Sequence, residues 1–247
     1  VCPTKAIVGE EFDGNLRLES TCPLLLATDT GDSSASMKNS TEIFNGKLET
    51  PEIWIDDHPK PAAQWDFSKN METQTIVEVG SNRFHGVLVN TPMRAATGHN
   101  WDGSSDSWTQ DPSQYGAIHF HDDDIYDFDW ETDFVFDVPI NLDSGLYGVR
   151  LSQGTNRDVV PIFICPPKGQ QNASLCLIAS TFTYTVYGNH ARPDYDPSWQ
   201  KKIEDWGAYP WNPAEFTEYG LSTYNYHSDG SGICHASYRR PLFTLRS

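Results

Sequence analysis

Two short stretches of the chain place tyrosines, a histidine and small hydroxyl residues where a strand should give way to a turn. The first spans residues 178–190 and the second spans residues 218–232. An ionised tyrosine is a hard anionic oxygen ligand, which suits a ferric ion better than zinc or copper(I). Tyr184 and Tyr224 are therefore candidates for half of an iron site. The competing interpretation is that both rings pack in the protein with their hydroxyls hydrogen-bonded, as buried tyrosines usually do.

The second stretch also carries groups that can move protons. His227 and Asp229 lie in the run His-Ser-Asp-Gly-Ser-Gly, and we expect them to act as catalytic residues near a substrate. Asp-Gly and Ser-Gly are equally ordinary tight-turn dipeptides, so a purely structural turn remains open. No Gly-x-Ser-x-Gly sequence is present, which argues against a serine hydrolase.

A second polar group occurs in His-Phe-His-Asp-Asp-Asp, residues 119–124. In a strand His119 and His121 would share one face, opposite Ile118 and Phe120. Two histidines with neighbouring carboxylates can bind a divalent metal. The alternative is a strand that ends in a solvated acidic loop without any ion.

Residues 1 to about 165 have the pattern of β structure. Short apolar or alternating runs recur between turn residues such as Asn-Gly and Asp-Ser-Gly, which is typical of a sandwich of antiparallel strands. The predicted strands are residues 24–27, 53–55, 75–79, 86–89, 117–121, 133–138, 145–151 and 159–164. In the run 133–138, Phe134, Phe136 and Val138 would share one buried face.

The pattern changes after residue 167. A polar linker precedes Leu175-Cys-Leu-Ile-Ala179, an apolar run typical of a buried parallel strand. Residues 199–206 form a plausible short helix with Trp199, Ile203 and Trp206 on one face. We therefore expect an α/β domain to begin here, with ligands bound beyond the carboxyl ends of its strands, near Tyr184 and Tyr187.

Composition excludes several classes of protein. The 247 residues include 34 acidic and 17 basic side chains, for a formal net charge of −17, which disfavours nucleic-acid backbones and anionic membranes. No apolar run is long enough to span a bilayer. The five cysteines form no Cys-x-x-Cys pair, so we expect reduced thiols in a cytoplasmic protein.

These motifs together carry a resemblance to a known family. The chain resembles the large (β) subunit of N,N-dimethylformamidase in the stretch Ser180–Tyr184, in the run 219–232 and in Arg239-Arg-Pro241. The resemblance covers nearly the whole chain. Shorter motifs upstream match the same family in the same order: Phe44–Lys47, Gln64–Phe67, His85-Gly86, Gly98–Trp101, Tyr115–Asp123 and Trp130–Phe134.

The resemblance implies a fold and a domain order. It implies a mainly β chain with a laminin-G- or concanavalin-like jelly-roll sandwich, followed by the start of an α/β catalytic domain. The expected domains are a sandwich over residues 1–140 that lacks its N-terminal part, a connecting β segment over 141–167, and an incomplete catalytic domain over 168–247. We therefore expect the chain to be a piece of a longer subunit.

The resemblance also implies an activity. In that family a mononuclear ferric ion has two tyrosine ligands, which match Tyr184 and Tyr224, and a glutamate that has no match in this chain. Tyr187 and Tyr219 are the alternative positions, since a shift of one turn would exchange them. The expected activity is hydrolysis of N-substituted formamides, with N,N-dimethylformamide as the small amide substrate, by metal-activated water.

The expected partners are the rest of the large subunit and a small subunit, in a hetero-oligomer. The competing hypothesis is a β-sandwich module that binds carbohydrate or another protein without catalysis. Exposed tryptophans in the polar loop that contains Trp101 and Trp108 would suit sugar binding, although such loops also pack against neighbouring domains.

Overall fold

The structure is a computed structural model. It describes residues 24–29, 42–55, 58–192, 196, 198–206 and 212–244. The predicted strand 24–27 lies in the first of these ranges, where the strand is instead β1, Thr28–Asp29, and pairs with β2, Glu42–Ile43.

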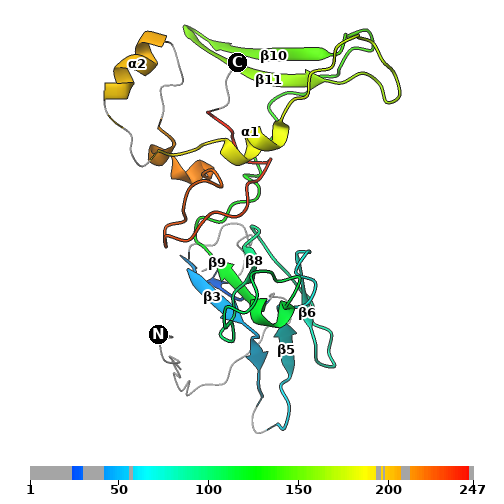
Figure 1. Cartoon of the computed structure of the whole chain (residues 1–247), viewed down its shortest axis with the longest axis vertical. Coiled ribbons are helices and arrows are strands. Elements are labelled where there is room, and N and C mark those ends of the chain that lie inside the picture. Colours follow the sequence, from blue (N-terminus) through cyan, green and yellow to red (C-terminus); the bar gives the residue numbers. More distant parts are fainter. Residues whose placement is uncertain are drawn as a thin grey trace.

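Two antiparallel sheets form the lower part of the molecule in Figure 1. One has the order β3-β9-β8 and the other the order β4-β5-β6-β7. Their strands are β3 (Gly46–Glu49), β4 (Glu52–Ile53), β5 (Ala63–Asp66), β6 (Thr75–Glu78), β7 (Gly86–Val87), β8 (Met93–Ala96) and β9 (Ala117–Phe120).

The core of this unit lies between the two sheets. Alternation along β5 buries Ala63 and Trp65, and Phe67 follows on the same side. They pack with Ile76 of β6 and Ile118 of β9, and half-buried side chains from both sheets surround this cluster: Leu48, Ile53, Leu88 and Phe120. The prediction of antiparallel β structure with a buried face is therefore confirmed.

An arginine ties the two sheets together through backbone carbonyls. Arg94 of β8 is buried, and its guanidinium donates to the carbonyl oxygens of Phe67 and Lys69 at 3.0 and 2.9 Å, and to those of Thr73 and Thr75 at 3.1 and 3.3 Å. The first three carbonyls belong to the turn between β5 and β6, and that of Thr75 belongs to the first residue of β6, so one side chain from one sheet satisfies the turn of the other.

A long hairpin follows the sheets. It consists of β10 (Gly145–Gln153) and β11 (Asn156–Ile164), paired antiparallel in continuous register. It coincides with the predicted strands 145–151 and 159–164, within the segment expected to connect two domains. Figure 1 shows it at the opposite end of the molecule from β5.

The predicted strand 133–138 is wrong. These residues form no strand, and Phe134, Phe136 and Val138 are exposed. Alternation specifies a face only if a neighbouring strand accepts the backbone hydrogen bonds, and no described strand lies beside this run.

The predicted buried strand 175–179 is wrong for the same reason. Leu175, Leu177 and Ile178 are exposed, and the described residues after β11 contribute helices but no strand.

The helices are α1 (Thr181–Tyr187), α2 (Ser198–Trp206) and the short 3-10 turns η3 (Pro213–Glu215) and η4 (Thr217–Tyr219). Another 3-10 turn, η2 (Pro112–Tyr115), precedes β9. Helix α2 confirms the helix predicted for 199–206.

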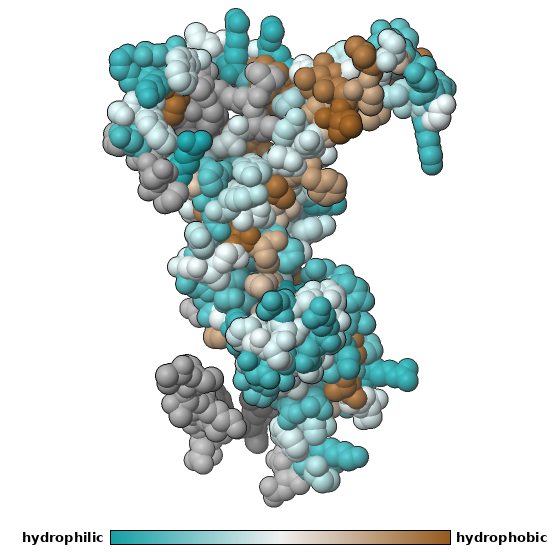
Figure 2. Space-filling view, in the orientation of Figure 1, coloured by the Kyte–Doolittle hydropathy of each residue, from teal (hydrophilic) through white to brown (hydrophobic). Residues whose placement is uncertain are grey.

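Apolar surface gathers at this end of the molecule. Figure 2 shows hydrophobic residues under the β10–β11 hairpin, on the side toward α1. Leu146, Val160 and Phe182 are among the exposed side chains. Among the described residues, none of the helices has the length and hydrophobicity that a membrane-spanning helix requires.

Candidate functional site

Helix α1 presents two tyrosines three residues apart. Residues at this spacing are neighbours on a helix surface, so Tyr184 and Tyr187 lie close to the same face. The Tyr184 ring stacks on Phe163 of β11 with centroids 6.1 Å apart. Both tyrosines are exposed, at 36% and 48%. They are accessible to a ligand or a neighbouring chain segment.

The loop after η4 is held against α1 by two hydrogen bonds to one carbonyl. The buried Ser222 hydroxyl donates to Val186 O at 2.7 Å, and the Thr223 amide donates to the same oxygen at 3.1 Å. These bonds place the Tyr224 ring against Tyr187, with centroids 4.2 Å apart and planes 20° apart.

The two tyrosine-bearing stretches therefore do meet. The ring that contacts Tyr224 is Tyr187, however, and not Tyr184. The hydrogen bond between the two side chains, together with the charge on Tyr224, raises the pKa of Tyr187, since the neutral Tyr187 hydroxyl is the donor. The assignment of Tyr184 and Tyr224 as iron ligands stays a prediction. The other alternative, Tyr219, packs among Phe128, Trp130, Phe216 and Phe243.

Buried polar side chains hold this tyrosine region in place. The Arg240 guanidinium donates to Thr185 O and Gly188 O at 2.9 Å each, where the carbonyls of α1 end without helical partners. Asn225 exchanges two hydrogen bonds with the backbone of Ala191, at 3.0 and 2.7 Å. The end of α1 and the Tyr224 loop are thus fixed together.

Replacing Asn189 by alanine should destabilise this region. Asn189 is fully buried, has a φ of 60°, and donates through its amide to Gly220 O at 3.0 Å and Pro241 O at 2.7 Å. Alanine would leave the carbonyls of Gly220 and Pro241 without these donors, and it would have to adopt a left-handed conformation that asparagine tolerates better. Together these effects should cost about 2–4 kcal/mol. Chemical denaturation measures the change. The control Asn82→Ala removes one exposed bond, and equal losses for both variants would contradict this account.

Histidines and aspartates from distant parts of the chain form a second group. We call it the His–Asp cluster: His119, His121, Asp123, Asp124, His227 and Asp229. The first four residues lie at the end of β9, and the last two lie in the turn 227–231. Figure 1 shows the C-terminal segment reaching back from α1 to the end of β9.

The imidazoles of the cluster contact one another. His121 has no exposed side-chain surface and stacks on His227 with centroids 3.7 Å apart and planes 3° apart. His119 and His121 are 4.1 Å apart and tilted by 46°. Ile118 and Phe120 point into the core instead, so the predicted division of β9 into two faces is confirmed.

Burial and charge shift the pKa values within the cluster. Burial lowers the pKa of His121 to about 4, and the neighbouring His227 and His119 lower it as well. Burial raises the pKa of Asp124 to about 7, against the effect of His227. Hydrogen bonds from Ser231 lower the pKa of Asp229 to about 2. The cluster thus favours a neutral His121 beside ionised Asp229.

Both residues predicted to be catalytic belong to this cluster. His227 Nδ1 lies 2.6 Å from Asp123 Oδ1, and Asp229 Oδ2 lies 2.9 Å from His119 Nε2. Their catalytic roles stay predictions. A small cavity of about 30 Å³ beside His227 is also lined by Asp124, Gly220 and Arg240. By volume it can hold one or two water molecules.

The acidic loop after β9 is exposed at Asp122, whereas His121 is buried against the C-terminal segment. The sequence alone did not show that residues 119–124 lie beside residues 227–229. The two parts are more than a hundred residues apart, and each alone is typical of a strand end or a tight turn. The only local signal was the pair of histidines on the polar face of β9.

The fold defines a mainly β chain of antiparallel sheets whose C-terminal segment brings phenols together at α1 and imidazoles together at β9. The family model described as N,N-dimethylformamidase beta subunit-like, C-terminal, matches residues 93–247. The chain belongs to this family.

Two curated relatives support the assignment. The N,N-dimethylformamidase beta subunit of Paracoccus aminophilus is 33% identical over 82% of this chain and 30% of its own length. The N,N-dimethylformamidase beta subunit of an Alcaligenes species is 32% identical over the whole chain and 36% of its own length. The chain therefore spans about a third of the length of these relatives.

Proposed function

We propose that the chain is part of the large subunit of an iron-dependent amide hydrolase that acts on N-substituted formamides, N,N-dimethylformamide among them. The relatives named as beta subunits of N,N-dimethylformamidase support the substrate class. The observation that carries the proposal is the meeting of the two tyrosine stretches, in which the ring of Tyr224 lies against α1.

The residues fit a ferric ion in the chemistry of their donor atoms. The rings of Tyr187 and Tyr224 have centroids 4.2 Å apart, and both are about half exposed, so an ion and a substrate can reach them. Tyr224 would provide one ligand. Tyr184 is the second ligand by resemblance, whereas Tyr187 is the α1 tyrosine that contacts Tyr224. A carboxylate from outside this chain would complete the site.

Bound ferric iron would supply Lewis acidity to the amide carbonyl and make water more acidic. The chain's own contribution is to hold the phenols. Ser222 and Thr223 fix the Tyr224 loop to Val186 O, and Arg240 fixes the end of α1. Net hydrolysis takes up one water and gives formate and dimethylamine, with no nucleophilic side chain required.

The rest of the large subunit and a small subunit are the partners we propose. The exposed apolar side chains Leu175, Leu177, Ile178 and Phe182 lie directly before or within α1. A surface of this kind is typical of an interaction site. We propose that the remainder of the large subunit packs there, close to the tyrosines whose ligand set it completes.

The assembled enzyme, with both subunits, tests this function. Incubated with N,N-dimethylformamide, it should release formate and dimethylamine in equal amounts, and removal of iron should stop the reaction. An iron-loaded assembly that hydrolyses no N-substituted formamide would show that the proposed substrate class is wrong. Binding to a carbohydrate without any turnover would favour the alternative of a binding module.

A further inference from the structure

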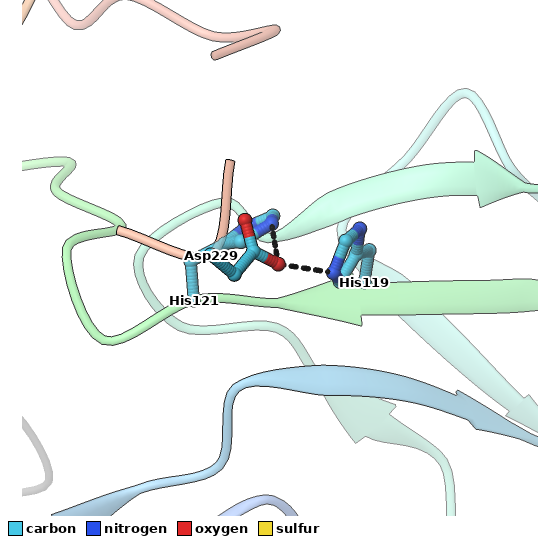
Figure 3. A group of neighbouring side chains, drawn as sticks. All are labelled: His119, His121 and Asp229. Atoms are coloured by element: carbon cyan, nitrogen blue, oxygen red, sulfur yellow. Dashed lines mark ion pairs between the residues drawn. The ribbon is translucent and has the colours of Figure 1, made fainter. Parts of the chain in front are cut away.

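The His–Asp cluster has the composition and placement of a second metal site. It lies where the end of β9 meets the turn 227–231, and Figure 3 shows His119, His121 and Asp229 with their side chains directed toward one another. The tyrosine region around α1 does not include any of these residues. The His–Asp cluster is therefore separate from the proposed iron site.

Three ligand atoms are spaced closely enough for one ion. Asp229 Oδ2 lies 2.9 Å from His119 Nε2 and 3.8 Å from His121 Nε2. Ligands at about 2.0–2.2 Å from a tetrahedral zinc ion are roughly 3.3–3.5 Å apart, so these distances need to change by only about half an ångström. The 46° tilt between the His119 and His121 rings allows their in-plane lone pairs to converge.

Neighbouring groups orient these ligands. Asp124 Oδ2 lies 3.3 Å from His121 Nδ1, the arrangement in which a carboxylate accepts the Nδ1 proton and directs Nε2 toward a metal. The Ser231 hydroxyl donates to Asp229 Oδ1 at 2.6 Å, which leaves Oδ2 toward the imidazoles. His121 Nε2 also lies 2.8 Å from Ser231 Oγ, a contact that an ion would replace.

A second possible set, His121, Asp124 and His227, is less suitable. His227 Nε2 is 4.0 Å from Asp124 Oδ1, and the rings of His121 and His227 are stacked in parallel. Lone pairs in parallel ring planes do not converge on one point. The short contact between His227 Nδ1 and Asp123 instead holds the His227 ring in the stack.

We propose that His119, His121 and Asp229 bind a divalent transition-metal ion that joins the end of β9 to the turn 227–231. Two imidazole nitrogens and one carboxylate oxygen suit zinc or cobalt rather than calcium or magnesium, which prefer oxygen ligands alone. The Asp229 side chain is 26% exposed, so water can complete the coordination. The ion would offset the negative charge that Asp123 and Asp229 place at this junction.

Metal titration of the chelator-treated protein tests the proposal, with zinc and cobalt as probes. We expect one equivalent of zinc to bind, and cobalt to give the visible bands of a nitrogen- and oxygen-ligated ion. The double variant His119→Ala, Asp229→Asn should bind zinc at least about 100-fold more weakly, since loss of supporting groups alone costs 10–100-fold. Zinc should raise the melting temperature of the native chain but not that of this variant.

Two further variants keep the test decisive. Asp229→Asn alone is nearly isosteric and retains an oxygen for Ser231, so it reports on the site if the double variant fails to fold. The control His99→Ala removes another histidine–carboxylate pair, at 2.8 Å from Glu49, and should leave zinc affinity unchanged. Absence of saturable binding to the native chain, or equal affinity in Asp229→Asn and the native chain, would overturn the proposal. Tyr224→Phe should leave zinc affinity intact, which separates this site from the iron site.

Discussion

Replacing Tyr224 by phenylalanine should abolish turnover of the assembled enzyme, with kcat reduced by at least about 10³-fold. The change removes one oxygen and keeps the ring that stacks on Tyr187. A Lewis-acid metal contributes several kcal/mol to the reaction, and every 1.36 kcal/mol is a factor of ten in rate. Iron content and the rate of dimethylamine release, measured on the same preparation, give the answer.

Parallel substitutions in α1 identify the second phenolate. If the ligand is the ring that contacts Tyr224, Tyr187→Phe should lose iron as completely as Tyr224→Phe. If the ligand is the residue assigned by resemblance, Tyr184→Phe should lose it instead. Tyr147→Phe in β10 is the matched control, because its hydroxyl donates to the backbone carbonyl of Asp143, just before the hairpin. Iron and activity retained in Tyr224→Phe would contradict the proposed site.

Replacing Arg94 by methionine should lower the free energy of unfolding by about 3–5 kcal/mol. The change leaves the carbonyls of Phe67, Lys69, Thr73 and Thr75 without their donors. Loss of one partner of a buried hydrogen bond costs about 1–3 kcal/mol, and the bonds of one side chain are not additive. Methionine retains much of the buried volume, so the change reports mainly on the lost bonds.

Urea denaturation of the chain measures this effect, with Arg150→Met as the control. Arg150 lies exposed on β10, away from the two sheets, and its replacement should change the free energy of unfolding by less than about 0.5 kcal/mol. If Arg94→Met and Arg150→Met unfold with the same free energy, the Arg94 guanidinium does not tie the sheets together.

Local patterns predicted β9 and the hairpin β10–β11, but not β3, β5 or β8. The hairpin β10–β11 and the two faces of β9 follow from alternation, because each has an adjacent strand or core to define its buried side. The runs 133–138 and 175–179 carry patterns of similar strength but have no neighbouring strand among the described residues. Alternation identifies the apolar face of a possible strand. Whether that face is buried depends on a neighbouring strand or core, which only the tertiary structure provides.

The candidate sites were predictable in their residue types and not in their pairings. Tyrosines at the two turns were evident, yet residues 184 and 187 lie one helical turn apart, so sequence alone could not say which one meets Tyr224. The partnership of His119 and His121 with Asp229 depends on a turn that reaches back across the molecule. No local pattern contains that information.

The visible absorption spectrum of the full-length enzyme, recorded together with its iron content, tests the central claim most directly. Two phenolates on one ferric ion should give an intense tyrosinate-to-iron charge-transfer band that scales with bound iron and disappears in Tyr224→Phe. A stoichiometric iron content without that band, or a band that survives the loss of Tyr224, would show that this loop does not bind the catalytic ion.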